Sequence, residues 1–280
     1  MPDGCAASGA LGHGIEVCVT APVFLSEPGE LDGTTAVLTG AEGRHAAAVR
    51  RMAVGETVHL VDGAGTRARC RVVEVGKERV VCAVEERGTD PQPSPPLTVV
   101  QALPKGDRGE LAVEVMTEAG VDRIVPWAAE RCITRWKPER AAKSLGKWRS
   151  TAREAAKQSR RSRIPEVADL AGIGDVCARI ASARVGIVLH EEADSRLSQL
   201  PLPVGSAAAA GDPPRAEDAP AAVPDGIVVV VGPEGGFAES ELRALDAAGA
   251  VRALLGSTVL RTSTAGVAAL AVLQARCGRW

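Results

Sequence analysis

One run of residues limits the fold of this chain more than any other: Ile-Val-Val-Val-Val at 227–231 leads directly into Gly-Pro-Glu-Gly-Gly at 232–236. Five consecutive apolar residues, all β-branched, favour a strand that is buried on both faces. Residues 237–242 then open a helix. Similar apolar runs lie at 97–103, 123–126, 185–189 and 252–255, and helical patterns at 108–119, 138–159 and 265–275 separate or follow them. Strands that alternate with helices predict an α/β domain whose parallel sheet is covered on both faces.

The residues before this domain follow a different pattern. Strands are expected at 57–61, 66–75 and 79–85, with one helix at 42–52, which indicates a small β-barrel over residues 21–88. Residues 89–96 form a proline-rich linker that no helix or central strand would accept. The predicted α/β domain fills 97–280. Residues 1–20 are expected to be a disordered extension without the pattern of a signal peptide, and 205–225 a flexible insertion.

Composition excludes several classes of protein. The 280 residues include seven cysteines without a Cys-x-x-Cys pair, so we expect neither a disulfide framework nor a metal site, and a cytoplasmic location. No apolar run approaches the roughly 18 residues that span a bilayer, so no membrane partner is expected. Aromatic residues make up only 2% of the chain, which counts against an RNA-binding surface of stacked aromatic rings.

The glycine-rich loop at 232–236 is the first candidate site. It has neither the Gly-x-Gly-x-x-Gly spacing of a dinucleotide site nor the Gly-Lys-Ser/Thr of a P-loop. Glu234, Glu239 and Glu241 place negative charge at the start of the following helix, which disfavours a phosphate. We therefore expect a neutral or cationic ligand; a tight turn without any ligand is the alternative.

A second loop repeats this design. Residues 254–265 contain a strand end, Gly256, an irregular segment and a helix that Ser263 or Thr264 would cap. The helix at 265–275 is apolar on almost every side, which predicts burial within the domain or between two subunits. Arg261 precedes this helix. It either forms a structural ion pair or stabilises negative charge that develops in a pocket.

These loops carry a family resemblance. Val-Gly-Pro-Glu-Gly-Gly-Phe at 231–237 and Leu-Gly-Ser-Thr-Val-Leu-Arg-Thr at 255–262 resemble the RsmE family of SPOUT methyltransferases. The resemblance runs from about residue 22 to the C-terminus and includes Gln-Ser-Arg-Arg-Ser-Arg-Ile-Pro at 158–165. It implies a PUA-like N-terminal barrel, a SPOUT domain with a C-terminal trefoil knot, and a homodimer. The implied activity is S-adenosylmethionine-dependent methylation of N3 of a specific uridine in 16S rRNA of the small ribosomal subunit.

The resemblance also assigns site residues. Those implied to line the S-adenosylmethionine pocket are Leu189, His190, Gly232, Pro233, Glu234, Gly235, Gly236, Leu255, Gly256, Val259, Leu260 and Thr262. Arg261 would stabilise the uracil anion. Two roles stay open for Glu234, either general base or cofactor ligand, and Ser263 stands where many family members have a carboxylate.

Charge placement points to RNA, although the formal net charge is −2. Residues 131–163 hold 12 Lys or Arg and two Asp or Glu, a net charge of +10, which leaves −12 on the rest of the chain. A solvated helix face is the alternative interpretation, but such faces normally mix both signs. With few aromatic residues, stacking on RNA bases would depend on Arg planes or aliphatic surface. The candidate RNA-binding residues are Arg44, His45, Arg50, Arg51, Arg149, Arg153, Lys157, Gln158, Arg160, Arg161 and Arg163.

Two other functions stay open at this point. The chain could be a SPOUT methyltransferase for another RNA, such as tRNA. It could also be a non-catalytic RNA-binding factor in ribosome assembly, although both glycine loops and Arg261 argue against that.

Overall fold

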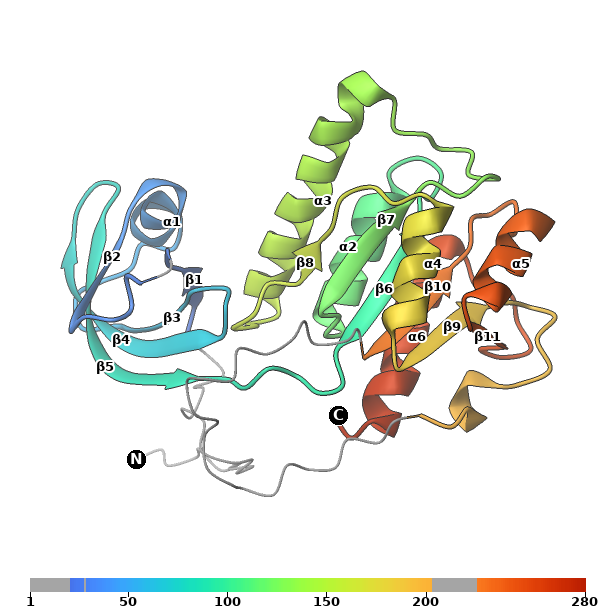
Figure 1. Cartoon of the computed structure of the whole chain (residues 1–280). Coiled ribbons are helices and arrows are strands. Elements are labelled where there is room, and N and C mark those ends of the chain that lie inside the picture. The colour runs from blue at the N-terminus through green and yellow to red at the C-terminus, as the bar shows by residue number, and fades with distance from the viewer. Residues whose placement is uncertain (1–20, 28, 203–225) are drawn as a thin grey trace. The chain divides into compact units, whose positions relative to one another are not determined.

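The computed structural model describes residues 21–27, 29–202 and 226–280 (Figure 1). The predicted extension at 1–20 and the whole of the predicted insertion at 205–225 lie outside the described residues. The chain divides into two compact units. The first comprises residues up to Pro91 together with Arg160–Arg163, and the second comprises Gln92–Ser159 and Ile164–Trp280.

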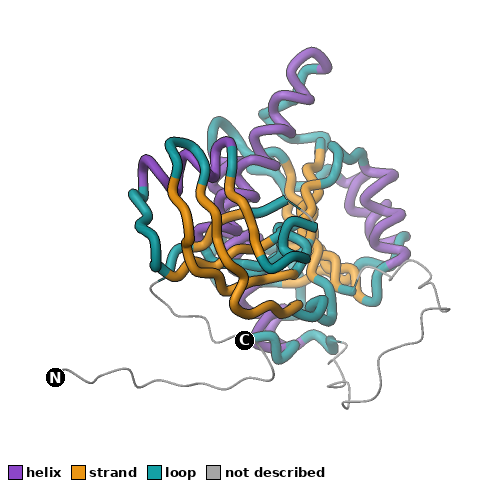
Figure 2. Tube along the Cα trace, turned by 90° about the vertical axis from the view of Figure 1, so that its left-hand side faces the viewer, coloured by secondary structure: helices purple, strands orange, loops and turns teal. Residues whose placement is uncertain are grey.

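The first unit is a curled five-stranded sheet, whose strands are orange in Figure 2. Its order is β1-β3-β4-β5-β2; β1 pairs with β3 in parallel, and the other pairs are antiparallel. Alternating burial along β4 places Ala68, Cys70 and Val72 in the core of the unit, as expected for a half-solvated strand. The strands are β1 (Val23–Leu25), β2 (Thr35–Leu38), β3 (Thr57–Val61), β4 (Thr66–Val75) and β5 (Val80–Thr89).

The helix of this unit is shorter than predicted. Residues 42–52 were expected to be one helix, but α1 (Gly40–Arg44) continues into a π-helical turn, His45–Val49, and ends there. The Arg50 amide donates to the carbonyl of His45, five residues back. Arg51 then has a positive φ of 51°, and a right-handed helix cannot include a residue in this conformation.

A short segment from far along the chain completes the first unit. The amide of Gly65 donates to the carbonyl of Ser162 (3.0 Å). The guanidinium of Arg163 donates to the carbonyls of Ala64 and Asp90, and the Ser162 hydroxyl donates to the Asp90 carboxylate. The sequence predicted a barrel over 21–88 and a second domain over 97–280, so it placed Arg160–Arg163 in the wrong unit.

The second unit contains a six-stranded sheet in the order β11-β9-β10-β6-β7-β8, and every neighbouring pair is parallel. β10 lies inside the sheet, between β9 and β6, and its five apolar residues are all buried. The prediction of a parallel α/β sheet is therefore confirmed. The strands are β6 (Leu97–Ala102), β7 (Arg123–Trp127), β8 (Glu166–Val167), β9 (Val185–Leu189), β10 (Ile227–Val231) and β11 (Val251–Ala253).

Helices cover both faces of this sheet (Figure 1). One layer holds α2 (Arg108–Glu118), α3 (Pro138–Gln158) and α6 (Thr262–Arg276), and the other holds α4 (Ile173–Ser182) and α5 (Glu239–Ala247). A short 3₁₀ helix spans Leu197–Gln199. The predicted cap of α6 is wrong, because the helix starts at Thr262 and neither Ser263 nor Thr264 caps it. Ser263 is buried instead, and the Thr264 hydroxyl donates to the Arg261 carbonyl.

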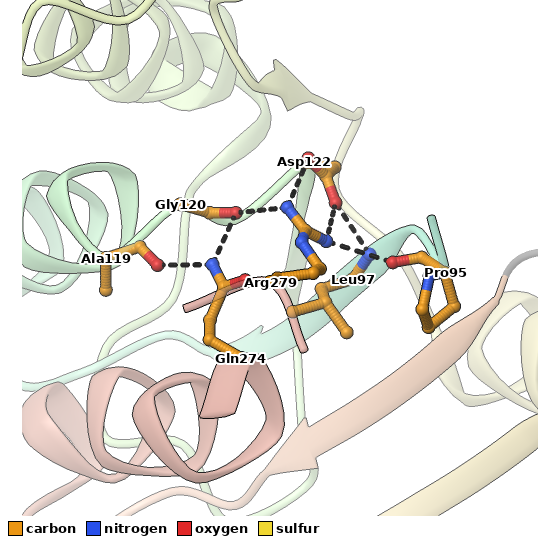
Figure 3. A network of polar contacts seen from close by, with 7 residues as sticks. All are labelled: Pro95, Leu97, Ala119, Gly120, Asp122, Gln274 and Arg279. Carbon is orange, nitrogen blue, oxygen red and sulfur yellow. Dashed lines mark hydrogen bonds and ion pairs between the residues drawn. The ribbon is translucent and has the colours of Figure 1, made fainter. Parts of the chain in front are cut away.

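The C-terminal end of α6 is fixed by a polar network (Figure 3). Arg279 donates to both oxygens of Asp122 (2.7 and 3.2 Å) and to the carbonyls of Pro95 and Gly120. Gln274 donates to the carbonyl of Ala119 (2.6 Å). Asp122 also accepts from the amide of Leu97, the first residue of β6. The network therefore ties the end of the chain to the beginning of the second unit.

Candidate functional site

A pocket lies at the carboxyl ends of three neighbouring strands. β9 ends at Leu189, β10 at Val231 and β11 at Ala253, and the loops that follow them enclose about 340 Å³. The carboxyl edge of a parallel sheet is where open α/β folds bind ligands. Three separate apolar runs of the sequence therefore converge on one cavity.

Glycines shape the first loop of this pocket. A Cβ at Gly232 would lie 2.5 Å from the ring of Phe237, so only glycine allows that ring to pack there. Gly236 has a φ of +69°. A Cβ at Gly236 or Gly256 would meet no atom within 4 Å, so at both positions bare backbone borders open space. Backbone amides and carbonyls can thus reach a ligand directly.

Aromatic packing supports the floor of the pocket. The ring of Phe237 lies 5.8 Å from that of Trp127 and 6.0 Å from that of His190. The Nδ1 atom of His190 accepts from the amide of Glu192 (3.2 Å), which fixes the imidazole at the end of β9. The histidine therefore presents a set orientation to the cavity.

The three glutamates predicted to set the local charge have different roles. Only Glu234 lines the pocket, and its carboxylate accepts from the amide of Lys105 (3.1 Å). Glu241 is 5% exposed and accepts from the amides of Ala238 and Glu130, so it caps α5 and fixes a loop. Glu239 is exposed and pairs with Arg243.

The pocket nevertheless favours a cation. Its lining includes two acidic residues, Glu191 and Glu234, and one basic residue, Arg261, a formal charge of −1. Glu191 was not predicted, although it directly follows His190 at the end of a buried strand. The expectation of a neutral or cationic ligand still agrees with this charge.

The second loop supplies an exposed apolar wall and a cation. Val259 is 83% exposed, and Leu260 and Arg261 are also exposed. Just beyond them, the carbonyl of Thr262 accepts from the amide of the buried Gln101 side chain (3.1 Å). The start of α6 is thereby fixed to β6 while the loop before it borders the cavity.

Of the twelve residues assigned to the pocket by resemblance, the structure brings eleven together. The exception is Gly235, where a Cβ would approach the backbone of Arg131, so that this residue faces another loop. Phe237, Ser257, Thr258 and Ala265 also line the cavity and were not predicted. Phe237 belongs to the same glycine-rich motif as Gly232, and a bulky ring that follows a glycine in one loop was the signal that could have placed it in the pocket.

The candidate RNA-binding residues are divided between the two units. Arg149 donates to the carbonyl of Val167 and pairs with Asp169 (2.9 Å), and with Arg153 it lines a groove of about 710 Å³. Arg44 pairs with Glu78, and Arg163 is held by backbone carbonyls. Arg50, Arg51, Arg153, Gln158 and Arg160 are exposed, whereas His45, Lys157 and Arg161 are half-buried or packed against neighbours.

The described residues contain no group of three or more His, Cys, Asp or Glu side chains arranged to hold a metal ion. In the same residues, no helix has the length and hydropathy needed to cross a membrane.

Comparisons with known proteins agree with this geometry. A sequence model of the RNA methyltransferase domain matches residues 91–274, and one of the RNA methyltransferase PUA domain matches residues 38–85. A protein of Mycobacterium bovis named Ribosomal RNA small subunit methyltransferase E is 44% identical over 252 residues, or 89% of each chain. The chain belongs to this RNA methyltransferase family.

Other relatives extend the match. A protein of the same name from Bacillus subtilis is 29% identical over 250 residues, covering 86% of this chain and 90% of that protein. Among solved structures, the Neisseria gonorrhoeae enzyme of this name, bound to S-adenosyl methionine, has a TM-score of 0.76 at 28% identity. That match covers 91% of this chain and 98% of the other. A putative methyltransferase from Legionella pneumophila, in complex with the same cofactor, has a TM-score of 0.75 at 28% identity.

Proposed function

We propose that this protein transfers a methyl group from S-adenosylmethionine to N3 of a specific uridine in the 16S rRNA of the small ribosomal subunit. The observation that carries the proposal is the pocket at the carboxyl ends of β9, β10 and β11. Relatives with the same fold and family are named as small subunit rRNA methyltransferases, and one is bound to S-adenosyl methionine.

The residues present fit this cofactor. S-adenosylmethionine carries a sulfonium cation, and the pocket has one net negative charge. Open backbone at Gly236 and Gly256 suits the ribose and adenine edges, while Leu189, Leu255 and Leu260 offer apolar surface to the adenine plane. When bound, the cofactor supplies an electrophilic methyl group.

Two side chains have roles at the uracil. N3 must lose its proton before it can accept a methyl group, and the resulting charge spreads onto the base oxygens. Glu234 is one of the two carboxylates that line the pocket, the other being Glu191. It lies beside the loop after β6, and it takes the N3 proton. Arg261 is the cation of the same pocket and stabilises the oxygens as they gain charge. His190, held by Glu192, orients the bound groups.

A C-terminal trefoil knot is part of the proposal. The support comes from the path of the chain after β11, an edge strand of the sheet. The amide of Leu254 donates to the carbonyl of Ser195, and the amide of Leu197 to the carbonyl of Leu254. Then α6 packs on β6, β10 and α2, and Arg276 donates to the carbonyl of Leu197. The last helix thus passes beside the segment that leaves β9.

A homodimer is proposed as well. On α6, residues Val267, Ala268, Ala271 and Val272 are only half-buried, although all four are apolar. Leu111 of the neighbouring α2 is 45% exposed. A second copy that covers these side chains would remove this apolar surface from water.

Two measurements test the enzyme. Calorimetric titration with S-adenosylhomocysteine should show one site per chain, and no binding would remove the cofactor proposal. Comparing N3-methyluridine in rRNA from a deletion strain and its parent should show loss of one modification in 16S rRNA. Unchanged 16S rRNA together with an altered tRNA would support the alternative substrate instead.

Variants of the two proposed catalytic residues provide the sharper test. Glu234→Gln and Arg261→Gln should each lower kcat by about 10²-fold or more, because one removes the proton acceptor and the other the charge that stabilises the anion. Glu239→Gln, an exposed change on α5 outside the pocket, is the matched control and should leave kcat unchanged. Full activity of both pocket variants would contradict the assigned roles.

A further inference from the structure

A second groove of about 440 Å³ lies beside the proposed cofactor pocket. Its walls are the loop after β6, the first turn of α2, the loop before α3 and the first half of α3. It has no part in the mechanism above. Its lining combines an aromatic ring with several cations, a pairing that suits nucleic acid.

The aromatic ring belongs to Trp136, which is partly exposed. It packs in a T-shaped arrangement on Trp148, with ring centroids 5.3 Å apart and an interplanar angle of 88°. Trp148 is 3% exposed and rests against α2, where a Cβ at Gly109 would lie 2.9 Å from its indole nitrogen. A buried partner thus holds Trp136 in place, so the ring can serve as a stacking surface that needs little ordering.

The groove is also cationic. It is lined by four basic residues, Arg135, Lys137, Arg140 and Lys147, against Asp107 and Glu110. Lys137, Arg140 and Lys147 are exposed, and within the described part of the chain none of the three forms an ion pair. Unpaired cations around an aromatic ring favour a ligand that joins a flat base to phosphate.

The groove adjoins the pocket through two contacts. The Glu234 carboxylate, which lines the pocket, accepts from the amide of Lys105, whose neighbours Pro104 and Gly106 line the groove. Next to this contact, a Cβ at Gly235 would lie 3.0 Å from the carbonyl of Arg131, so the loop before α3 touches the glycine-rich loop. A molecule in the groove would therefore lie next to the site of methyl transfer.

We propose that this groove receives an unstacked nucleotide of the RNA substrate, adjacent to the methylated base. Its base stacks on Trp136, and its phosphates lie beside Arg140 and Lys147. The inference rests on the proposed function. It replaces the expectation that stacking on RNA bases depends on Arg planes or aliphatic surface. Although the chain has few aromatic residues, one of them, Trp136, lines this groove.

Binding measurements test the groove. Affinity for a 16S rRNA fragment should fall about tenfold in Trp136→Ala and stay close to wild type in Trp136→Phe, which keeps a stacking ring. Lys147→Ala should weaken binding several-fold. Lys143→Ala is the matched control on the same helix, because Lys143 does not line the groove. All four variants should bind S-adenosylhomocysteine like wild type. Unchanged RNA affinity in Trp136→Ala with intact cofactor binding would overturn the proposal.

Cross-linking of the wild-type protein covers the case in which Trp136→Ala does not fold. The rRNA fragment is transcribed with 5-iodouridine, irradiated in the complex, and the modified peptide is identified by mass spectrometry. Cross-links within residues 134–148 are expected, and cross-links confined to other segments would overturn the proposal. Failure of the proposed function looks different: wild type would leave uridine N3 unmethylated, whatever peptide is cross-linked.

Discussion

Gly232 shapes the first pocket loop because it has no side chain. Its missing side chain leaves room for the Phe237 ring, which in turn packs on Trp127 and His190. A methyl group at 2.5 Å from that ring cannot be accommodated without movement. The loop, the ring and the imidazole therefore form one packed unit that lines the pocket at the carboxyl ends of β9, β10 and β11.

Gly232→Ala should lower the free energy of unfolding by about 1–3 kcal/mol and strongly weaken S-adenosylhomocysteine binding, because the ring must shift. Urea unfolding and calorimetry measure the two effects. Gly146→Ala is the control: a Cβ there meets nothing within 4 Å in an exposed part of α3. It should stabilise the protein by about 0.5–1 kcal/mol. Equal effects of the two substitutions would contradict the packing argument.

His59 makes the first unit sensitive to acid. The side chain is 3% exposed on β3, and its Nε2 atom has no hydrogen-bond partner among the described residues. Burial lowers the pKa of His59 from 6.5, and the positive charges of Arg67, Arg160 and Arg69 lower this pKa further, against a smaller opposing effect of Glu86. The folded protein therefore keeps His59 neutral at a pH where the unfolded chain takes up a proton.

The sign of the pH effect follows from this depressed pKa. The stabilisation is complete above pH 6.5 and is lost as the pH falls towards the folded-state value, with a slope of at most about 1.4 kcal/mol per pH unit. Between pH 7.5 and 5.5, the hydrogen-exchange protection factors of the β3 and β4 amides, corrected for the intrinsic exchange rate at each pH, should fall more in wild type than in His59→Leu. Parallel pH dependence in the two proteins would contradict the assignment.

At the residue scale, the sequence predicted which residues gather but not what each one does. Eleven of the twelve residues that the family resemblance assigns to the pocket do line it, whereas the pattern of apolar runs and glycines alone indicated only the two loops. The role of Glu241 was missed, since its contacts with Glu130 and Ala238 involve backbone amides that no residue pattern reveals. Trp136 was missed for a different reason: a composition of 2% aromatic residues says nothing about where a single ring lies.

At the element scale, the long periodic segments were predictable and the short ones were not. β3, β4, β9 and β10 have the predicted bounds, because alternation or continuous β-branched runs define them. β1, β2 and β8 have two to four residues, too few for a period to be visible. The π-helical turn after α1 ends with a bond from the Arg50 amide to the carbonyl of His45, five residues back, and the sequence has no signal for that displacement.

The attachment of α6 suggests a test at this scale. Arg279→Met removes the ion pair with Asp122, whose two side chains are 11% and 19% exposed, together with bonds to the carbonyls of Pro95 and Gly120. The loss should lower the free energy of unfolding by about 2–3 kcal/mol, because Asp122 keeps a partly buried charge. Tryptophan fluorescence is a suitable readout, since all four tryptophans lie in the second unit.

Arg243→Met provides the control for this change. Arg243 also pairs with a carboxylate, that of Glu239, but both side chains are about 70% exposed. Its loss should cost less than about 0.5 kcal/mol. If the two substitutions cost the same, the network in Figure 3 contributes no more than an exposed ion pair.

At the scale of the whole molecule, charge placement matters more than total charge. The chain is −2 overall, yet residues 131–163 carry +10. The structure distributes these cations over both sides of α3, with Arg140 and Lys147 at one groove and Arg149 and Arg153 at another. The sequence revealed the positive run but not this division, which depends on what packs against each side of the helix.

Affinity for the 16S rRNA fragment should therefore depend strongly on salt. With about four to eight phosphate contacts, the logarithm of the association constant should fall against the logarithm of salt concentration with a slope of about −3 to −6. Binding of S-adenosylhomocysteine should barely change over the same range. A flat salt dependence for the RNA would show that the positive run is a solvated surface.

The return of Arg160–Arg163 to the first unit has a consequence for synthesis of the protein. When residues 21–91 have left the ribosome, Ser162 and Arg163, which bind Gly65 and Asp90 in the folded unit, have not yet been made. Some seventy further residues must be translated before those partners exist, which at bacterial speeds takes on the order of 4–14 s. For that interval the nascent sheet is incomplete. A gene fragment that stops at residue 91 would make this temporary state permanent.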